Sequence, residues 1–274
     1  MNSLNIKLLL NKKSLGMSLL GFSAGLPLLL IFSTLSVWLV KAGVETSTIT
    51  LFSCAGFAYS FKFLWTPIVD HYRLPLLSKI GHRKSCLLLS QILIINSIFI
   101  TSYSDPSKNL LYTAIGIVLI AFSSATQDIV IDAFRIESEP IQKQGALSSM
   151  YLAGYRIAMI VSGAGSLWLA SYFGVDVYNA NTWKKIYQIM GCLMLIGVVT
   201  TLFSKEPTVH KVKNKNTSNS IKFLMSLIVA IAIFFVTYNL IPKIFTNESI
   251  FLNSLDALLR IGVSFGGSLF ILSL

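Results

Sequence analysis

The sequence has few charged residues. Asp, Glu, Lys and Arg make up 12% of its 274 residues, and only 11 residues are acidic. Soluble domains carry about 25% charged residues, so the composition excludes an ordinary soluble protein. Hydrophobic residues make up 54% of the chain, and several stretches reach the roughly 20 apolar residues that a membrane-spanning helix needs. We therefore predict an all-α membrane protein.

Cysteine and histidine are scarce as well, with three of each. The cysteines lie in separate apolar stretches with no paired spacing, which favours neither a disulfide nor a metal site: Cys54, Cys86 and Cys192. The histidines lie in the connections between apolar stretches, away from any membrane serine that they could activate: His71, His82 and His210. There is no His-Glu-x-x-His motif and no Gly-x-x-x-x-Gly-Lys motif. We expect no metal, no cofactor and no enzymatic activity.

The apolar stretches predict six spanning helices, at about residues 15–40, 47–70, 85–103, 110–134, 145–173 and 186–203. Residues 1–14 form the N-terminus, and the polar, basic residues 204–220 are typical of a linker. Residues 221–274 predict one or two further helices, the last running to the end of the chain. We expect a six-helix bundle over residues 15–203, followed by a linker and a shortened second part.

The net charge of +11 does not indicate nucleic-acid binding, because the Lys and Arg residues lie in the short connections between apolar stretches. Alternate connections face alternate sides of a membrane. On this assignment fourteen basic residues share the side of the N-terminus and five lie on the other side. The positive-inside rule then places the N-terminus in the cytoplasm.

The fourth predicted helix carries a polar stripe. Residues spaced by three or four share a helix face, so Ser124, Asp128, Asp132 and Arg135 lie together, with Gln127 beside them. Ionisable groups inside a membrane segment are rare and usually line a path for ions or substrate. The two aspartates also resemble one of the two Asp-rich clusters of a membrane prenyltransferase, but the second cluster is missing. The stripe therefore favours a transporter.

Two cations complete the set of buried charges. Arg156, in the fifth predicted helix, is the partner that we expect for Asp128, because Arg135 can pair locally with Asp132. The pair is either a structural link between helices or a protonatable carboxyl group that depends on Arg156. Lys62, in the second predicted helix, either meets an anionic substrate or serves as a counter-ion for Asp128 or Asp132.

The connection between the second and third predicted helices resembles the signature of the major facilitator superfamily. That signature has an Asp, a basic residue and a Gly-x-Arg-Arg-like turn. Here Asp70 is followed by His71 in place of the usual Arg, and Gly81-His82-Arg83-Lys84 supplies the turn after an insertion. The resemblance implies a conformational latch at the cytoplasmic end that includes Asp70, Arg83, Lys84 and Arg135.

Four longer segments resemble the AmpG permeases: GFSAGLP at 21–27, YSFKFLWTP at 59–67, SATQDIVIDA at 124–133 and GYRIAMIVSG at 154–163. The resemblance covers about residues 15–205. It implies the N-terminal six-helix bundle of a permease in the bacterial inner membrane. The expected function is proton-coupled import of anhydro-muropeptides for peptidoglycan recycling.

The resemblance also implies residue roles. The proton would be carried by Asp128 and Asp132. The substrate would be contacted by a second group of residues: Tyr59, Lys62, Gln127, Tyr155 and Arg156. Members of the superfamily need two six-helix halves around a central site. We therefore expect either a second half-transporter chain as partner, or a truncated remnant or assembly subunit that does not transport.

Overall fold

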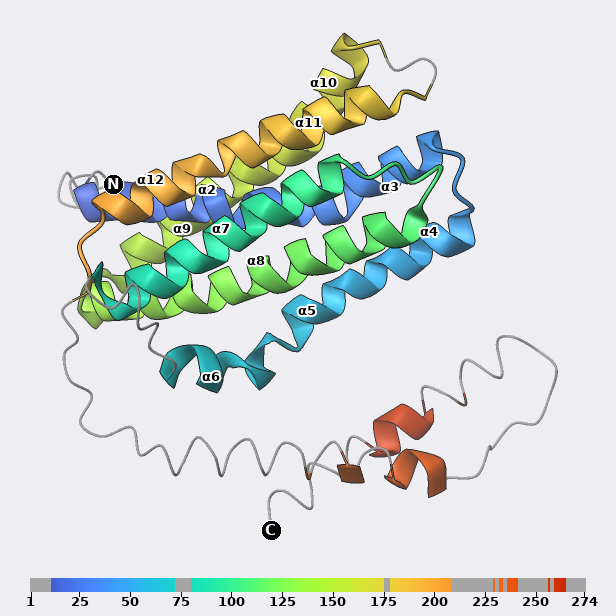
Figure 1. The fold of residues 1–274 in the computed structure, drawn as a ribbon. Helices are drawn as coiled ribbons and strands as arrows, with labels where there is room; N and C mark the ends of the chain where they lie inside the picture. The colour runs from blue at the N-terminus through green and yellow to red at the C-terminus, as the bar shows by residue number, and fades with distance from the viewer. Residues whose placement is uncertain are drawn as a thin grey trace. The chain divides into compact units, whose positions relative to one another are not determined.

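The computed structural model describes residues 11–71, 80–174 and 178–207 of a first unit. In a second unit, which begins at Lys211, it describes residues 229, 232–233, 236–240, 256 and 259–264. All regular elements of the described first unit are helical (Figure 1), which confirms the predicted all-α class. The predicted linker at 204–220 and the predicted helices beyond it lie largely outside the described residues.

Five of the six predicted spans are continuous stretches that are long and apolar enough to cross a membrane. They consist of α2 (Lys12–Ile31) with α3 (Ser33–Lys41), α7 (His82–Ser102), α8 (Leu110–Ser138), α9 (Ile141–Ile160) with the π-helical turn η4 (Val161–Gly165) and α10 (Ser166–Tyr172), and α11 (Ala180–Leu193) with α12 (Leu195–Phe203). The chain is therefore a multi-pass membrane protein.

The second predicted span is not one helix, so that prediction is wrong in detail. It is divided into α4 (Thr46–Phe52), the 3₁₀ turn η1 (Ser53–Gly56), α5 (Phe57–Ser60), the 3₁₀ turn η2 (Lys62–Leu64) and α6 (Thr66–His71) (Figure 1). Pro67 lies in the first turn of α6, where its missing N–H costs no helical hydrogen bond. One consequence matters for the site: Lys62 lies in a 3₁₀ turn rather than in a regular helix.

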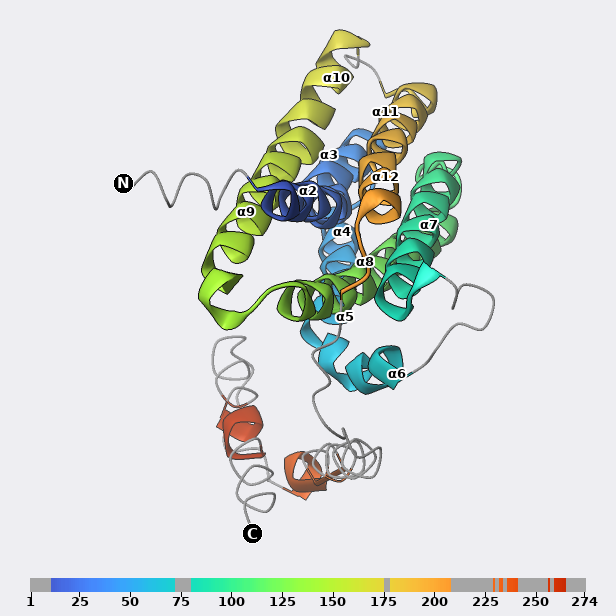
Figure 2. The same cartoon turned by 90° about the vertical axis from the view of Figure 1, so that its left-hand side faces the viewer.

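Helix α2 lies at the centre of the bundle and packs against α8, α9 and α12 (Figure 2). Glycines allow its close approach to α9. A Cβ atom at Gly21 would overlap the carbonyl oxygen of Tyr151, and one at Gly25 would overlap that of Tyr155. Small residues of this kind let membrane helices meet backbone to backbone. The contact fixes the register of α9 and therefore the positions of Tyr151 and Tyr155.

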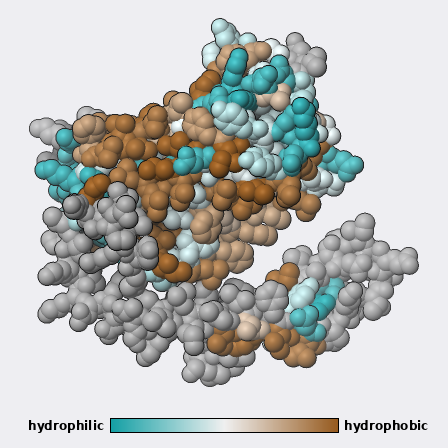
Figure 3. Space-filling view, in the orientation of Figure 1, coloured by the Kyte–Doolittle hydropathy of each residue, from teal (hydrophilic) through white to brown (hydrophobic). Residues whose placement is uncertain are grey.

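The two ends of the bundle are named here after one residue at each. The Arg83 end holds the starts of α2, α7 and α9, and the Asp105 end holds the starts of α4, α8 and α11. Between them the surface is largely apolar: on the face in Figure 3, hydrophobic residues cover the middle of the helices and polar residues gather toward the ends. Such a surface requires lipid or another protein surface to cover it.

Candidate functional site

Lys62 and Asp128 form an ion pair within the membrane segment. Lys62 Nζ lies 3.7 Å from Asp128 Oδ2, and it joins η2 to the middle of α8. The exposed fractions of the two side chains are 34% and 12%, so the pair is buried on the Asp128 side and open on the Lys62 side. Charges at this depth are costly without a partner, and the pair provides one while leaving Lys62 within reach of a second anion.

Tyrosines surround the carboxyl group of Asp128. Tyr59 of α5 and Tyr151 and Tyr155 of α9 each interact electrostatically with it. The rings of Tyr151 and Tyr155 have their centroids 6.0 Å apart with a tilt of 46°. The predicted residues Tyr59, Lys62, Asp128 and Tyr155 are thus brought together, and the site gains Tyr151. The only signal for Tyr151 in the sequence is its spacing of four residues from Tyr155.

Arg156 does not pair with Asp128, so this predicted pair is wrong. Its side chain is exposed, and its Nη1 donates to Met159 Sδ of the same helix at 4.0 Å. The reason is rotation about the axis of α9. Tyr155 faces Asp128, and the next residue along a helix points about 100° away from it. Arg156 forms no ion pair among the described residues of the first unit.

Gln127 also lies apart from the Asp128 cluster. Its side chain is fully buried, and Nε2 donates a 2.7 Å hydrogen bond to Ser23 Oγ of α2. Ser23 Oγ in turn donates to Met194 Sδ at 3.7 Å, between α11 and α12. This arrangement favours a helix-packing role for Gln127 over the predicted contact with substrate.

Asp132 and Arg135 pair within α8, as their spacing of three residues predicts. Arg135 Nη2 lies 3.1 Å from Asp132 Oδ1, and Arg135 Nη1 also donates to Ser148 Oγ of α9. Arg135 therefore ties α8 to α9. The predicted place of Arg135 in the latch stays a prediction.

Arg83 organises the charges at its end of the bundle. Its Nη1 lies 2.7 Å from Asp70 Oδ1. Its Nε and Nη2 donate to the two carboxylate oxygens of Glu137 at 3.0 and 2.6 Å. This fork-to-carboxylate geometry is the strong, directional kind that Arg provides. Arg83 thus joins the ends of α6 and α8 to the start of α7.

Glu206 completes this cluster from the far end of the first unit. Its carboxylate accepts hydrogen bonds from the backbone N–H groups of Arg83 and Lys84, at 2.8 and 3.0 Å. Lys84 Nζ donates to the carbonyl oxygen of Leu202 at 3.1 Å. A carboxylate is favourable at a helix N-terminus, and Gly81 leaves the space for it, because a Cβ there would collide with Glu206.

Three of the four predicted latch residues, Asp70, Arg83 and Lys84, lie together here with Glu137 and Glu206, which the sequence prediction did not include. Each of the two glutamates follows the apolar part of a predicted helix, and both helices end on the side of the membrane to which the basic turn was assigned. That shared position is the signal that could have found them. We call Asp70, Arg83, Lys84, Glu137 and Glu206 the Arg83 cluster.

The opposite end has a smaller cluster around Asp105, in the connection between α7 and α8. Tyr178 Oη and Ser107 Oγ donate to Asp105 Oδ1 at 2.6 and 2.7 Å. Burial raises the pKa of Asp105, but these hydrogen bonds outweigh it, so the pKa lies below its usual value. The Tyr178 bond ties this connection to the segment before α11.

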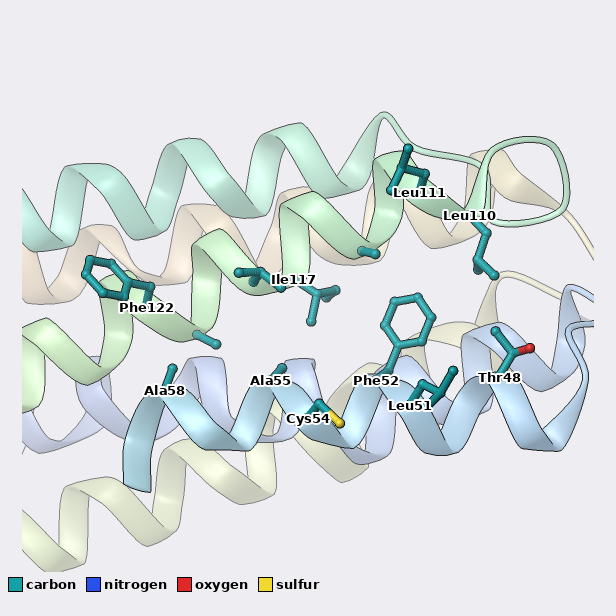
Figure 4. A pocket seen from close by; sticks show the side chains of 13 residues that line it. Thr48, Leu51, Phe52, Cys54, Ala55, Ala58, Leu110, Leu111, Ile117 and Phe122 are labelled. Carbon is teal, nitrogen blue, oxygen red and sulfur yellow. The ribbon is translucent and has the colours of Figure 1, made fainter. Parts of the chain in front are cut away.

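An apolar groove lies between α4, η1, α5 and α8, beside the charged site rather than at it (Figure 4). Its volume is about 460 Å³, and it extends along α8 from Leu110 to Phe122, toward the Asp105 end. Beyond it, Trp65 stacks on Phe122 with ring centroids 4.7 Å apart. The groove has no charged lining residue, so it does not provide the chemistry of the site.

The chain belongs to the Major Facilitator Superfamily, whose family model matches residues 17–274. More particular similarities agree with the resemblance in the sequence. The chain is 37% identical over 209 residues to the anhydromuropeptide permease of Escherichia coli (strain K12), which is 76% of this chain and 40% of that protein. It is 35% identical over 200 residues to the putative transporter AmpG 4 of Rickettsia felis, covering 73% of this chain and 47% of that protein.

A third relative, the putative transporter AmpG 1 of Rickettsia conorii, is 32% identical over 244 residues, 81% of this chain and 57% of that protein. The predicted resemblance to AmpG-type permeases is therefore confirmed. The chain spans about half the length of these relatives or less, so the activity of a whole permease is a proposal for this chain.

Proposed function

We propose that this chain forms the N-terminal half of a proton-coupled importer of anhydromuropeptides in the inner membrane of a bacterium. The observation that carries the proposal is the Lys62–Asp128 pair, which lies within the membrane segment and is open on the Lys62 side. The similarity to a permease named for anhydromuropeptides supports the choice of substrate.

The pair couples a proton to substrate binding in a direct way. A proton on Asp128 removes its charge, and Lys62 then lacks its counter-ion within the membrane. A carboxylate of the substrate can replace it, so protonation and substrate binding favour each other. Tyr155 interacts electrostatically with Asp128, and Tyr155 and the adjacent exposed Arg156 would contact the rest of the substrate. Asp132 provides a second acidic group one turn from Asp128.

The Arg83 cluster serves as the latch at the cytoplasmic end. It joins the ends of α6, α8 and α12 to the start of α7 while it is formed. Opening at this end requires these elements to separate. The positive-inside rule places this end in the cytoplasm, together with the N-terminus.

A second half completes the site on its open side. It is either a further part of a longer protein, a second half-transporter chain or another copy of this chain. The alternative function is that of a remnant or assembly subunit, in which Lys62–Asp128 only holds η2 against α8. The half-length match to the relatives keeps this alternative open.

The test is uptake of labelled anhydromuropeptide in cells that lack their own permease. The chain is expressed alone and together with a C-terminal half of an AmpG-type permease, and insertion of the protein in the membrane is verified. We expect uptake with the second half present, and loss of uptake when an uncoupler collapses the proton gradient. A correctly inserted pair that takes up no label, or one whose accumulation survives the uncoupler, contradicts the proposal.

A further inference from the structure

The two carboxylate oxygens of Asp128 lie in different surroundings. Oδ2 faces Lys62 Nζ at 3.7 Å. Oδ1 is buried and has no hydrogen-bond partner among the described residues. A buried polar atom without a partner is costly, and a carboxyl oxygen can be satisfied either by accepting a hydrogen bond or by carrying a proton. Asp128 Oδ1 is therefore the oxygen of this carboxyl group whose hydrogen bonding is not satisfied by the described residues.

Two hydroxyl groups near Asp128 are also buried without a hydrogen-bond partner among the described residues: Tyr59 Oη and Ser124 Oγ. Tyr59 precedes Lys62 by three residues, and Ser124 precedes Asp128 by four. Since α5 and η2 both pack against α8, one turn from the ion pair toward the Asp105 end brings Tyr59 opposite Ser124. Tyr59 is close enough to Ser124 for a side-chain hydrogen-bond interaction, although not in standard hydrogen-bond geometry, and it interacts electrostatically with Asp128, which agrees with this placement.

We propose that Tyr59 and Ser124 form the pocket that holds the coupled proton on Asp128 Oδ1, a role that rests on the proposed function. A hydroxyl group can both donate and accept a hydrogen bond, so the same two groups serve both states of Asp128. They donate to Oδ1 when the carboxylate is charged. When Oδ1 takes a proton from a hydronium ion, which leaves as water, one hydroxyl turns and accepts a hydrogen bond from the protonated carboxyl group.

In this pocket the two oxygen atoms of the Asp128 carboxyl group have different roles. Lys62 interacts with the carboxylate through Oδ2, and the two hydroxyls stabilise the proton on Oδ1. The proton and Lys62 therefore do not compete for the same oxygen atom. The other charged or titratable groups that face Asp128 come from three elements: Lys62 of η2, Asp132 of α8, and Tyr151 and Tyr155 of α9, of which Tyr151 also comes within side-chain hydrogen-bond reach of Asp128. Tyr59 and Ser124 are thus positioning residues, and Tyr59 is not a substrate contact.

The direct test is infrared difference spectroscopy on the full chain in lipid vesicles during a pH step. The carbonyl band of protonated Asp128 is identified by its absence in Asp128→Asn. Removing both hydroxyls, with Tyr59→Phe and Ser124→Ala, is expected to shift this band to higher frequency, because the acid loses its hydrogen-bond partners. Each single variant is expected to give part of the shift, which keeps the test usable if the double variant does not fold. Ser123→Ala, which removes the neighbouring buried hydroxyl, is the matched control and is expected to leave the band in place.

A transport measurement complements the spectrum. Tyr59→Phe is expected to reduce proton-driven accumulation by about 2- to 10-fold, the worth of one hydrogen bond, with KM unchanged. A band that does not move, or the absence of a protonated Asp128 band at any pH, overturns the inference, as does a raised KM with normal accumulation. If the band moves as expected but the wild type with its second half takes up no muropeptide, the pocket stands and the proposed function fails.

Discussion

Among single residues, Arg83 is a buried cation that pairs with two carboxylates. One guanidinium group satisfies Asp70 and Glu137, and its side chain is only 11% exposed. Arg83→Gln leaves both carboxylates without this cation. Breaking a fully buried pair costs about 3–5 kcal/mol, and we expect less here because Glu137 is 24% exposed. Thermal unfolding in detergent measures the loss.

Arg83→Lys is the matched variant for that experiment. It keeps the charge but lacks the planar fork that binds both Glu137 oxygens. We expect its stability to fall between the wild type and Arg83→Gln. Equal stability of all three proteins would show that the Arg83 cluster is solvated and contributes nothing.

Glu139 gives a prediction about pH at the same end. The hydrogen bond from Lys13, with a 2.7 Å ion pair, lowers the pKa of Glu139, and Lys143 adds to this at 3.1 Å. A group whose pKa is lowered on folding stabilises the protein above its unfolded pKa of about 4.3. That contribution is lost as the pH falls through the lower folded value.

The measurement compares the wild type with Glu139→Gln in thermal unfolding between pH 7 and pH 3. We expect the wild type to be more stable at pH 7, by less than about 1 kcal/mol because Lys13 is exposed. The difference should disappear toward pH 3. A difference that stays constant over this range would contradict the role of the Glu139 carboxylate.

Residue spacing predicted local contacts and missed distant ones. The Asp132–Arg135 pair follows from a separation of three residues on one helix, and the structure confirms it. The partner of Asp128 could not be predicted in this way. Helix α9 has no distinct apolar and polar faces, so its sequence does not reveal that Tyr155 rather than Arg156 faces α8.

At the scale of elements, the contact between α2 and α9 depends on missing side chains. Gly21→Ala places a methyl group against the backbone of Tyr151. We expect it to destabilise the protein by about 1–3 kcal/mol, the usual cost of overpacking. It should also reduce transport, because α9 carries Tyr151 and Tyr155 into the site.

Gly16→Ala is the control on the same helix, because a Cβ there meets nothing within 4 Å. We expect it to be neutral or stabilising by up to about 1 kcal/mol, since glycine is a poor helix former. Thermal unfolding of both variants decides the matter. Similar effects of the two substitutions would mean that the close approach of α2 and α9 is unimportant.

The elements themselves were largely predictable from runs of apolar residues, which gave five of the spans. The second span was the exception. Its apolar residues predict a span, but composition does not report the 3₁₀ turns at Ser53–Gly56 and Lys62–Leu64. The position of Pro67 was visible, but it indicates a local kink rather than a division into short helices.

For the molecule as a whole, we predict an orientation in the membrane. Lys108, at the Asp105 end, should face the periplasm, and Lys143, at the Arg83 end, the cytoplasm; their side chains are 83% and 44% exposed. In a background without the native cysteines, a membrane-impermeant maleimide should label Lys108→Cys in intact cells. It should label Lys143→Cys only after lysis, and the reverse pattern would overturn the assignment.

The class and family were also accessible from the sequence, through composition and four motif segments. The Arg83 cluster was accessible only in part. Glu206 lies more than 120 residues from Arg83, and no periodicity connects the end of α12 with the start of α7. Contacts of this kind arise from the packing of the bundle, which places three helix ends around one arginine.

In the proposed mechanism Asp128, paired with Lys62, couples protons to transport, and the variant Asp128→Asn tests this coupling. Accumulation of labelled anhydromuropeptide and counterflow exchange are measured for Asp128→Asn with the second half present. Glu45→Gln, which removes an exposed acidic group outside the site, is the control. We expect Asp128→Asn to reduce accumulation by at least about 10-fold, a differential effect of roughly 1.4 kcal/mol or more, and to retain exchange. Accumulation equal to that of Glu45→Gln and the wild type would contradict it.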